Sequence, residues 1–466
     1  MKTARLIHRI EACDLSSIEI NMRVDKTTLY DLAVFHKEDD YSLFAKIDYT
    51  RTSEGKSALY QLFSSPFDNL KDIHETQAIL SLYENKIHEW PTRITNGTLL
   101  IIEKFLDENP DTIPKHPDFI RALLYKLLHP ADYAMIHFSM NQMFEFIKGF
   151  ESIILFFNNQ SIPPKLAMLL QDAERIIKNR RLTEFNSHNN FSSLTRASIL
   201  SFGSLFHVDM IADVRKLITI YGQLDAWYAM AFANHSLKLL SPDFIDQYAP
   251  VINAKGLKHI MLAEPVAYDL TMDKNANFIF LTGANMAGKS TLIKAIGLSV
   301  YLAHLGMGVP AFQMQLTLFD GILTNINVED NLVKGESYFF NEVKRIRETI
   351  IKITNGKRWL VLIDEIFKGT NIQDAMKCST AVIKGLIKMQ NGLFILSTHL
   401  YEIGEELKTL PSISFKYFET QLINNELFFS YQLKDGISQD RMGYLILQKE
   451  GVTKLLDDIG NNTTAV

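Results

Sequence analysis

Residues Gly283 to Thr291 read Gly-Ala-Asn-Met-Ala-Gly-Lys-Ser-Thr. This stretch fits the phosphate-binding loop pattern G-x-x-x-x-G-K-[ST], which requires a strand before it and a helix after it. The apolar run at 278–281 is typical of a buried strand, and the pattern at 292–302 predicts a helix. A chance match in a chain of this length has a probability on the order of one per cent, and the flanking strand and helix lower it further.

The chemistry of phosphate binding explains why these residue types occur at this spacing. Gly283 and Gly288 let the backbone curl so that its N–H groups point at phosphate oxygens. Lys289 supplies a cation to the terminal phosphates, Ser290 supplies a hydroxyl for Mg²⁺, and the following helix presents its positive end. We therefore expect nucleotide contacts along the whole loop: Gly283, Ala284, Asn285, Met286, Ala287, Gly288, Lys289, Ser290 and Thr291.

A second apolar run, at 359–363, ends in the adjacent carboxylates of Asp364 and Glu365. This is the Walker B arrangement, in which Asp364 would hold Mg²⁺ and Glu365 would orient and deprotonate the attacking water. Alone, the pair would equally fit two solvated acids at a strand end. Beside a phosphate loop, the probability that these are merely two solvated acids falls to roughly one in twenty. A third run, 392–399, ends in His399, which we expect to sense the terminal phosphate, although a half-buried strand-end histidine is the plain alternative.

The segment 319–343 resembles the stretch between phosphate loop and Walker B in the MutS family, where an S-x-F-x-x-E motif serves as the ABC-type signature. Here that motif is Ser337, Phe339 and Glu342. The loop is similar to the family's N-M-x-G-K-S-T form, and 364–371 resembles its Walker B and D-loop. Residues 42–55 are similar to the start of the MutS lever and core domain. The resemblance spans roughly residues 25 to 443.

The resemblance implies an α-helical lever and core domain, residues 1–250, followed by an ABC-type P-loop ATPase domain with a mostly parallel sheet, residues 251–466. It implies ATP and Mg²⁺ as cofactors, hydrolysis with Lys289, Glu365 and His399 in catalytic roles, and Ser290 and Asp364 as metal ligands. Ser337 precedes a predicted helix at 338–354, where it can cap the N-terminus and bind an anion. In ABC-type ATPases that end faces the γ-phosphate held by the other protomer, so we expect a homodimer.

Departures from the family pattern limit what the resemblance implies about DNA. The lever-like sequence begins almost at Met1, and little follows Gly443. The one Phe-x-Glu triplet, 340–342, lies inside the signature motif. We therefore expect a ligand that is DNA of unspecified structure, without mismatch reading. Two alternatives are an ABC-type ATPase whose helical arms bind a protein partner, and a small-molecule kinase. The signature motif and the Asp364–Glu365 pair argue against the kinase.

Composition is compatible with a protein that has a large core and no overall excess of positive charge. The chain has 466 residues, 47% hydrophobic and 22% charged, with a net charge of -5. Arg175, Lys178, Arg180 and Arg181 form a candidate basic patch, for which a solvated helix end is at least as good an interpretation. Cys13 and Cys378 lack metal-ligand spacing. They fit a reducing cytoplasm, and no apolar run reaches membrane-spanning length.

Periodicity divides the chain near residue 250. Long amphipathic helices are predicted before that point, with a single helix over 206–239, and alternating strands and helices after it. Trp227, Tyr228 and Phe232 on the long helix are expected to pack in the core rather than to stack on bases.

Overall fold

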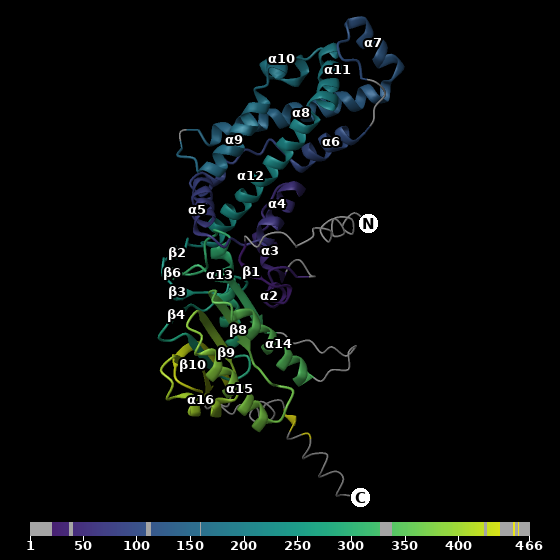
Figure 1. Cartoon of the computed structure of the whole chain (residues 1–466). Coiled ribbons are helices and arrows are strands. Elements are labelled where there is room, and N and C mark those ends of the chain that lie inside the picture. Colours follow the sequence, from purple (N-terminus) through teal and green to yellow (C-terminus); the bar gives the residue numbers. More distant parts are fainter. Residues whose placement is uncertain are drawn as a thin grey trace, which may run out of the picture.

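The computed structural model describes residues 21–36, 41–108, 113–158, 160–326, 338–423 and 426–438, together with 451, 452 and 455. The molecule is elongated (Figure 1). An arm of helices forms one end and an α/β domain forms the other. The helix α7 (Phe119–Leu128) lies at the far tip of the arm.

The arm consists of helices that run along one another from the α/β domain to the tip (Figure 1). Several begin at a side chain that accepts a backbone N–H, such as Thr52, Asn69 and Thr95. The helices are α3 (Leu43–Ile47), α4 (Ser53–Ser64), α5 (Leu70–Glu84), α6 (Asn96–Asp107), α7, α8 (Pro130–Phe156), α9 (Pro164–Ile177), α10 (Thr183–Ser187), α11 (Arg196–Ser204) and α12 (Ile211–Leu237).

The helix α12, with 27 residues, packs against α4 and α5 in the arm. Its Trp227 and Tyr228 are buried and Phe232 is partly buried against the same core, which confirms the prediction for these aromatic residues. The buried carboxylate of Asp225 accepts the backbone N–H groups of Arg51 and Thr52, so α12 fixes the start of α4.

The prediction of one helix over 206–239 is wrong at its beginning. Residues Leu205–Asp209 form a π-helical turn, η5, in which the N–H of Met210 donates to the carbonyl of Leu205. Met210 then leaves the helical conformation, and the chain bends by 81° between Arg196–Asp209 and Ile211–Leu237. A π-turn adds a residue to the helical repeat and shifts the buried face, which a pattern of apolar residues does not reveal.

The α/β domain contains a seven-stranded sheet, and this confirms the predicted helical region followed by a mostly parallel sheet. The order is β1-β7-β8-β9-β5-β10-β11, with every neighbouring pair parallel except β10 and β11. The strands are β1 (Arg23–Val24), β5 (Phe278–Thr282), β7 (Gly321–Asn325), β8 (Trp359–Asp364), β9 (Gly392–Ser397), β10 (Ile413–Ile423) and β11 (Glu426–Asp435). A second sheet has the order β2-β6-β3-β4, with β2 (Asp243–Phe244), β3 (Ile252–Leu257), β4 (Tyr268–Met272) and β6 (Gln313–Leu316).

Helices cover both faces of the large sheet, so its central strands are buried throughout. The helix α13 (Lys289–His304) packs on the face that shares its core with the arm. The opposite face forms a separate core with α14 (Tyr338–Ile353), α15 (Ile372–Leu386) and α16 (Tyr401–Leu407).

Hydrogen bonds at the end of α13 and a short strand are among the contacts that join the arm to the α/β domain. At the end of α13, the hydroxyl of Tyr301 donates to the carbonyl of Phe63, and His304 Nδ1 lies 2.7 Å from the carbonyl of Phe67. The short β1 pairs with β7, and α2 (Lys26–Asp31) packs on the same strand. The division at residues 250 and 251 stays a prediction, but the segment from β1 to α2 lies with the α/β domain.

Among the described helices, none alone is long and apolar enough to cross a membrane. The bent pair at 196–209 and 211–237 reaches that length and composition when its two parts are taken together.

Candidate active site

The loop from Gly283 to Gly288 joins β5 to α13, as the sequence predicts. Its backbone turns through positive φ at Gly283 (141°), Met286 (68°) and Gly288 (110°). A Cβ atom at Gly283 would lie 3.2 Å from the carbonyl oxygen of Phe418, so this glycine is required both for its conformation and for close packing. The curled backbone and the first turn of α13 therefore present N–H groups to one point, as an anion site needs.

Lys289 lies at the centre of this loop. Only 5% of the residue is exposed, and its Nζ donates to the carbonyl oxygens of Gly283 at 2.8 Å and Ala284 at 3.0 Å. Burial lowers the pKa of Lys289, while the carboxylates of Glu365 and Asp364 act in the opposite direction. A buried cation held by neutral carbonyls is well placed to exchange them for phosphate oxygens.

The strands β5, β8 and β9 lie parallel in the order β8-β9-β5 and end at one edge of the sheet. The loop after β5, the acids at the end of β8 and the histidine after β9 therefore lie close together. Asp364, the last residue of β8, accepts hydrogen bonds from Ser290 at Oδ2 and from Ser397 at Oδ1. Ser290 and Asp364 thus form a pair of hard oxygen donors beside the loop. Mg²⁺ typically uses one or two such protein ligands together with waters and phosphate oxygens, so the residues present fit a magnesium ion.

Glu365 follows β8 in a left-handed conformation, with φ 58°. One carboxylate oxygen lies 3.9 Å from Lys289 Nζ, and the other lies 3.0 Å from Lys368 Nζ and 3.8 Å from His399 Nδ1. Burial by itself raises the pKa of Glu365, but the hydrogen bond and charge of Lys368, with the charge of Lys289, offset it and lower the pKa below its ordinary value. The carboxylate is therefore ionised at neutral pH and able to accept a proton.

The side chain of His399 is 58% exposed and faces Glu365 from the end of β9. The structure thus brings together Lys289, Ser290, Asp364, Glu365 and His399, while their chemical roles stay predictions. The site also contains Lys368, which the sequence interpretation did not single out. It comes three residues after Glu365, in the turn that returns its ammonium group to that carboxylate.

A pocket of about 680 Å³ opens beside the loop, within the range of small-molecule sites. Asn285, Met286 and Thr291 line it with the residues already described, and Tyr268 and Tyr431 form an aromatic wall. A Cβ atom at Gly288 would lie 3.6 Å from the ring of Tyr431. The sequence interpretation missed both tyrosines, because no motif marks either one. Tyr268 is on β4 of the second sheet, and Tyr431 is on β11, which folds back on the loop from more than a hundred residues away.

Ser337, the first residue of the predicted signature motif, lies outside the described residues. Phe339 and Glu342 of the same motif are on α14 and contact the turn after β8. The carboxylate of Glu342, only 3% exposed, accepts the backbone N–H groups of Lys368 at 3.1 Å and Gly369 at 3.2 Å. The ring of Phe339 lies 5.8 Å from that of Phe367, centroid to centroid. The start of α14 is thereby fixed to the segment that carries Glu365 and Lys368.

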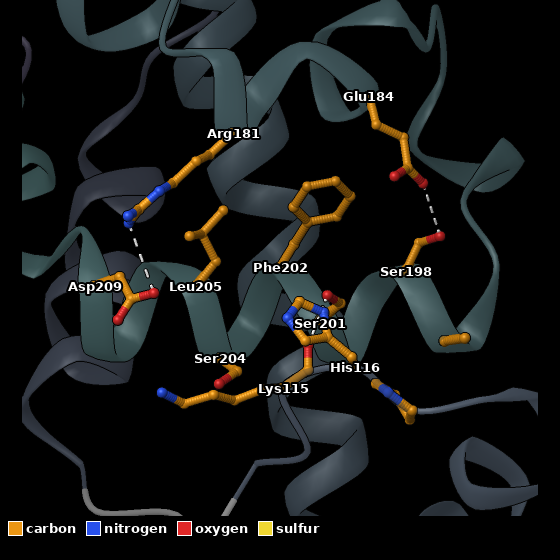
Figure 2. A pocket seen from close by; sticks show the side chains of 12 residues that line it. Lys115, His116, Arg181, Glu184, Ser198, Ser201, Phe202, Ser204, Leu205 and Asp209 are labelled. Carbon is orange, nitrogen blue, oxygen red and sulfur yellow. Dashed lines mark hydrogen bonds and ion pairs between the residues drawn. The ribbon is translucent and has the colours of Figure 1, made fainter.

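The candidate basic patch lies far from this site, on the arm. Figure 2 shows a polar pocket there, in which Arg181 points to Asp209, 3.6 Å away, and Ser198 donates to Glu184. Arg175 pairs with Asp172, and Lys178 pairs with Glu174. The patch cations that form these pairs are matched by carboxylates of their own chain, as in the alternative interpretation of a solvated helix end.

Comparison with known proteins gives consistent matches. The family model "MutS domain V" matches residues 279–460. The chain is 24% identical over 418 residues to the DNA mismatch repair protein MutS of Staphylococcus haemolyticus, covering 86% of this chain and 46% of that protein. It is 29% identical over 233 residues to the MutS of Oceanobacillus iheyensis, covering 49% of this chain and 27% of that protein.

A eukaryotic relative, the DNA mismatch repair protein MSH3 of Candida glabrata, is 29% identical over 250 residues, which cover 52% of this chain and 24% of that protein. The chain therefore spans less than half the length of each of these relatives. The family model matches the part of the chain that holds the site, and the match to the Staphylococcus protein, over 86% of this chain, extends into the arm.

Proposed function

This chain belongs to the MutS family, and on that premise we propose that it is a Mg²⁺-dependent ATPase that acts on DNA as a homodimer. The observation that carries the proposal is the convergence of Lys289, the Ser290–Asp364 pair and Glu365 at one edge of the parallel sheet. A buried cation, a pair of hard oxygen donors and an ionised carboxylate are the parts that phosphoryl transfer to water requires.

Each residue has a distinct task in hydrolysis. The loop N–H groups and Lys289 hold the β- and γ-phosphates, and Tyr431 offers an aromatic face to the base. Glu365 orients the attacking water and takes its proton, since Lys368 and Lys289 keep that carboxylate ionised. His399 is placed to hydrogen-bond the transferred phosphate or the water. Ser290 and Asp364 would hold Mg²⁺, which would supply positive charge to offset the negative charge on the phosphate oxygens.

We propose further that the site is shared between two copies, with Ser337 of one copy facing the γ-phosphate held by the other. The resemblance of the 337–342 motif to the ABC-type signature supports this assignment, because in ABC-type ATPases that motif faces the γ-phosphate held by the other protomer. Within this chain, Glu342 on α14 accepts hydrogen bonds from the turn after β8, so the motif is joined to the segment that carries Glu365. The names of the relatives support DNA as the ligand. The location of the one Phe-x-Glu triplet within α14 supports binding without mismatch preference.

The rate of ATP hydrolysis, measured alone and with a panel of matched, mismatched, branched and single-stranded DNA, tests this proposal. We expect basal Mg²⁺-dependent hydrolysis that DNA changes, and weak, salt-sensitive binding without preference for a mismatch. Lys289→Ala provides the background rate in the same assay. If no DNA binds at low salt while hydrolysis persists, the DNA part fails and a protein ligand of the arm takes its place. A clear mismatch preference in competition at fixed salt would show that the chain reads mismatches after all.

A further inference from the structure

The helix α7, at the tip of the arm, carries large apolar side chains that face solvent. Its exposed residues are separated alternately by one and three positions, and at 100° per residue they occupy about half of the helix circumference. The other half holds Ala122 and Tyr125, which are buried against the arm. The exposed set, with the exposed fraction of each residue, is Phe119 (71%), Ile120 (67%), Leu123 (36%), Leu124 (50%), Leu127 (68%) and Leu128 (72%). We call this set the tip face.

The tip face is large for a monomer. At roughly 100 Å² for each side chain, it exposes on the order of 600 Å² of apolar surface, at the upper end for the largest patch of a typical monomeric protein. If the same face covered itself across a two-fold axis, about 1,200 Å² would be buried in total, which reaches the lower limit of stable protein interfaces. Its size therefore matches what a pairing with a second copy needs.

The charges beside the tip face are directed to their own chain. Arg121, at one border, lies 3.9 Å from the carboxylate of Asp118. Lys126, at the other border, lies over the ring of Tyr133, 5.4 Å from its centroid. The apolar half of the helix thus contains no charged side chain. Membrane-surface helices usually present basic residues to the lipid headgroups and are often longer than the ten residues of α7. An apolar protein surface is the better match.

We propose that the tip face is a homodimer contact, in which α7 packs antiparallel against α7 of a second copy. Leu123 and Leu124 lie at the middle of the helix, so a two-fold axis there would place Phe119 and Ile120 of one copy against Leu127 and Leu128 of the other. The arms would then be joined at their tips, at the opposite end of the molecule from the nucleotide site (Figure 1). Because apolar contact needs no nucleotide, this pairing is independent of the ATP-closed dimer.

Sedimentation of the full chain without nucleotide tests the contact, with the double variant Leu124→Glu/Leu127→Glu. Two carboxylates in each half of the contact would be buried without partners, so we expect the dissociation constant to rise at least about tenfold. The matched control is Leu155→Glu, because Leu155 is 67% exposed on α8 and lies outside the tip face. This control should leave self-association unchanged, and so should Lys289→Ala, which removes the proposed nucleotide binding.

Cross-linking with a short bismaleimide gives a second measurement that does not introduce charge. In a chain with Cys13→Ser and Cys378→Ser, we expect Leu124→Cys to give covalently cross-linked dimers without ATP and Leu155→Cys to give none. The proposal is overturned if neither measurement detects self-association, or if the glutamates leave it unchanged. Binding of the monomeric chain to anionic lipid vesicles, lost in the double variant, would instead assign the tip face to a membrane. If the native chain self-associates but does not hydrolyse ATP, the proposed nucleotide site is contradicted and the tip-face contact is not.

Discussion

Glu365 is the residue on which the proposed chemistry depends, and its backbone is unusual. A left-handed conformation in a residue that is not glycine costs on the order of 1 kcal/mol and persists only where the surroundings impose it. Here the next turn also contains Phe367 at φ 61°. These two residues aim the carboxylate at Lys289, Lys368 and His399 instead of letting it continue along the strand. The strain is localised where a precisely oriented base would be needed.

At this scale, the first prediction separates nucleotide binding from hydrolysis. Glu365→Gln should retain ATP binding and lower the hydrolysis rate by about 10²–10⁴, because the amide can hold water but cannot accept its proton. Lys289→Ala should abolish ATP binding, since it removes the cation at the centre of the loop. Equilibrium binding of a fluorescent ATP analogue, together with single-turnover rates, distinguishes the two variants. Hydrolysis by the glutamine variant at the native rate would show that Glu365 is not the base.

The second prediction concerns pH. Lys368 holds the pKa of Glu365 below its ordinary value, so in the native protein the base stays ionised into the acid range. Lys368→Met removes this effect and leaves burial to raise the pKa. The acid limb of the hydrolysis profile should therefore move to higher pH. Lys377→Met, at an exposed position on α15, is the matched control and should keep the native profile. An unshifted acid limb in the Lys368 variant would exclude this role.

At the scale of elements, α14 and the turn after β8 form one unit. The buried carboxylate of Glu342 accepts two backbone N–H groups of that turn. Glu342→Ala would leave both donors without their partner, at a cost of about 1–3 kcal/mol if they remain buried. We expect slower hydrolysis with ATP binding retained, because the loop at 283–288 is not touched. Glu348→Ala, at an exposed position on the same helix, is the control. Equal rates for the two variants would show that Glu342 is not a positioning residue.

Elements with strong local signals could be predicted from the sequence. The buried runs that form β5, β8 and β9 are apolar throughout, and each is followed by residues of a known motif. The sequence therefore predicted both the strands and the edge of the sheet at which the site lies. Elements defined by distant partners could not. The two-residue β1 is a strand only because β7 lies beside it, and Tyr431 reaches the pocket only because the β10–β11 hairpin folds over the loop. The π-turn η5 reflects local packing that an apolar pattern does not encode.

For the molecule as a whole, α13 is the direct connection between site and arm. Its first residue is Lys289, and its last turn holds the arm through Tyr301 and His304. The backbone N–H of Phe319 lies 3.2 Å from His304 Nε2, so Nδ1 carries the proton donated to Phe67. Burial lowers the pKa of His304 to about 4, which keeps this link neutral at physiological pH. The helix α13 therefore connects the loop to the arm by a continuous stretch of hydrogen-bonded backbone.

The central claim is that two copies complete one another's ATP site, and mixing two inactive variants tests it most directly. Ser337→Ala lacks the proposed trans hydroxyl, and Lys289→Ala lacks the loop cation. Each should be nearly inactive alone. Mixed dimers contain one site with both defects and one with neither, so random pairing should restore up to about a quarter of native hydrolysis. Light scattering must confirm that subunits exchange. No recovery in exchanged dimers, or hydrolysis by a monomer at a rate independent of dilution, would contradict the shared site.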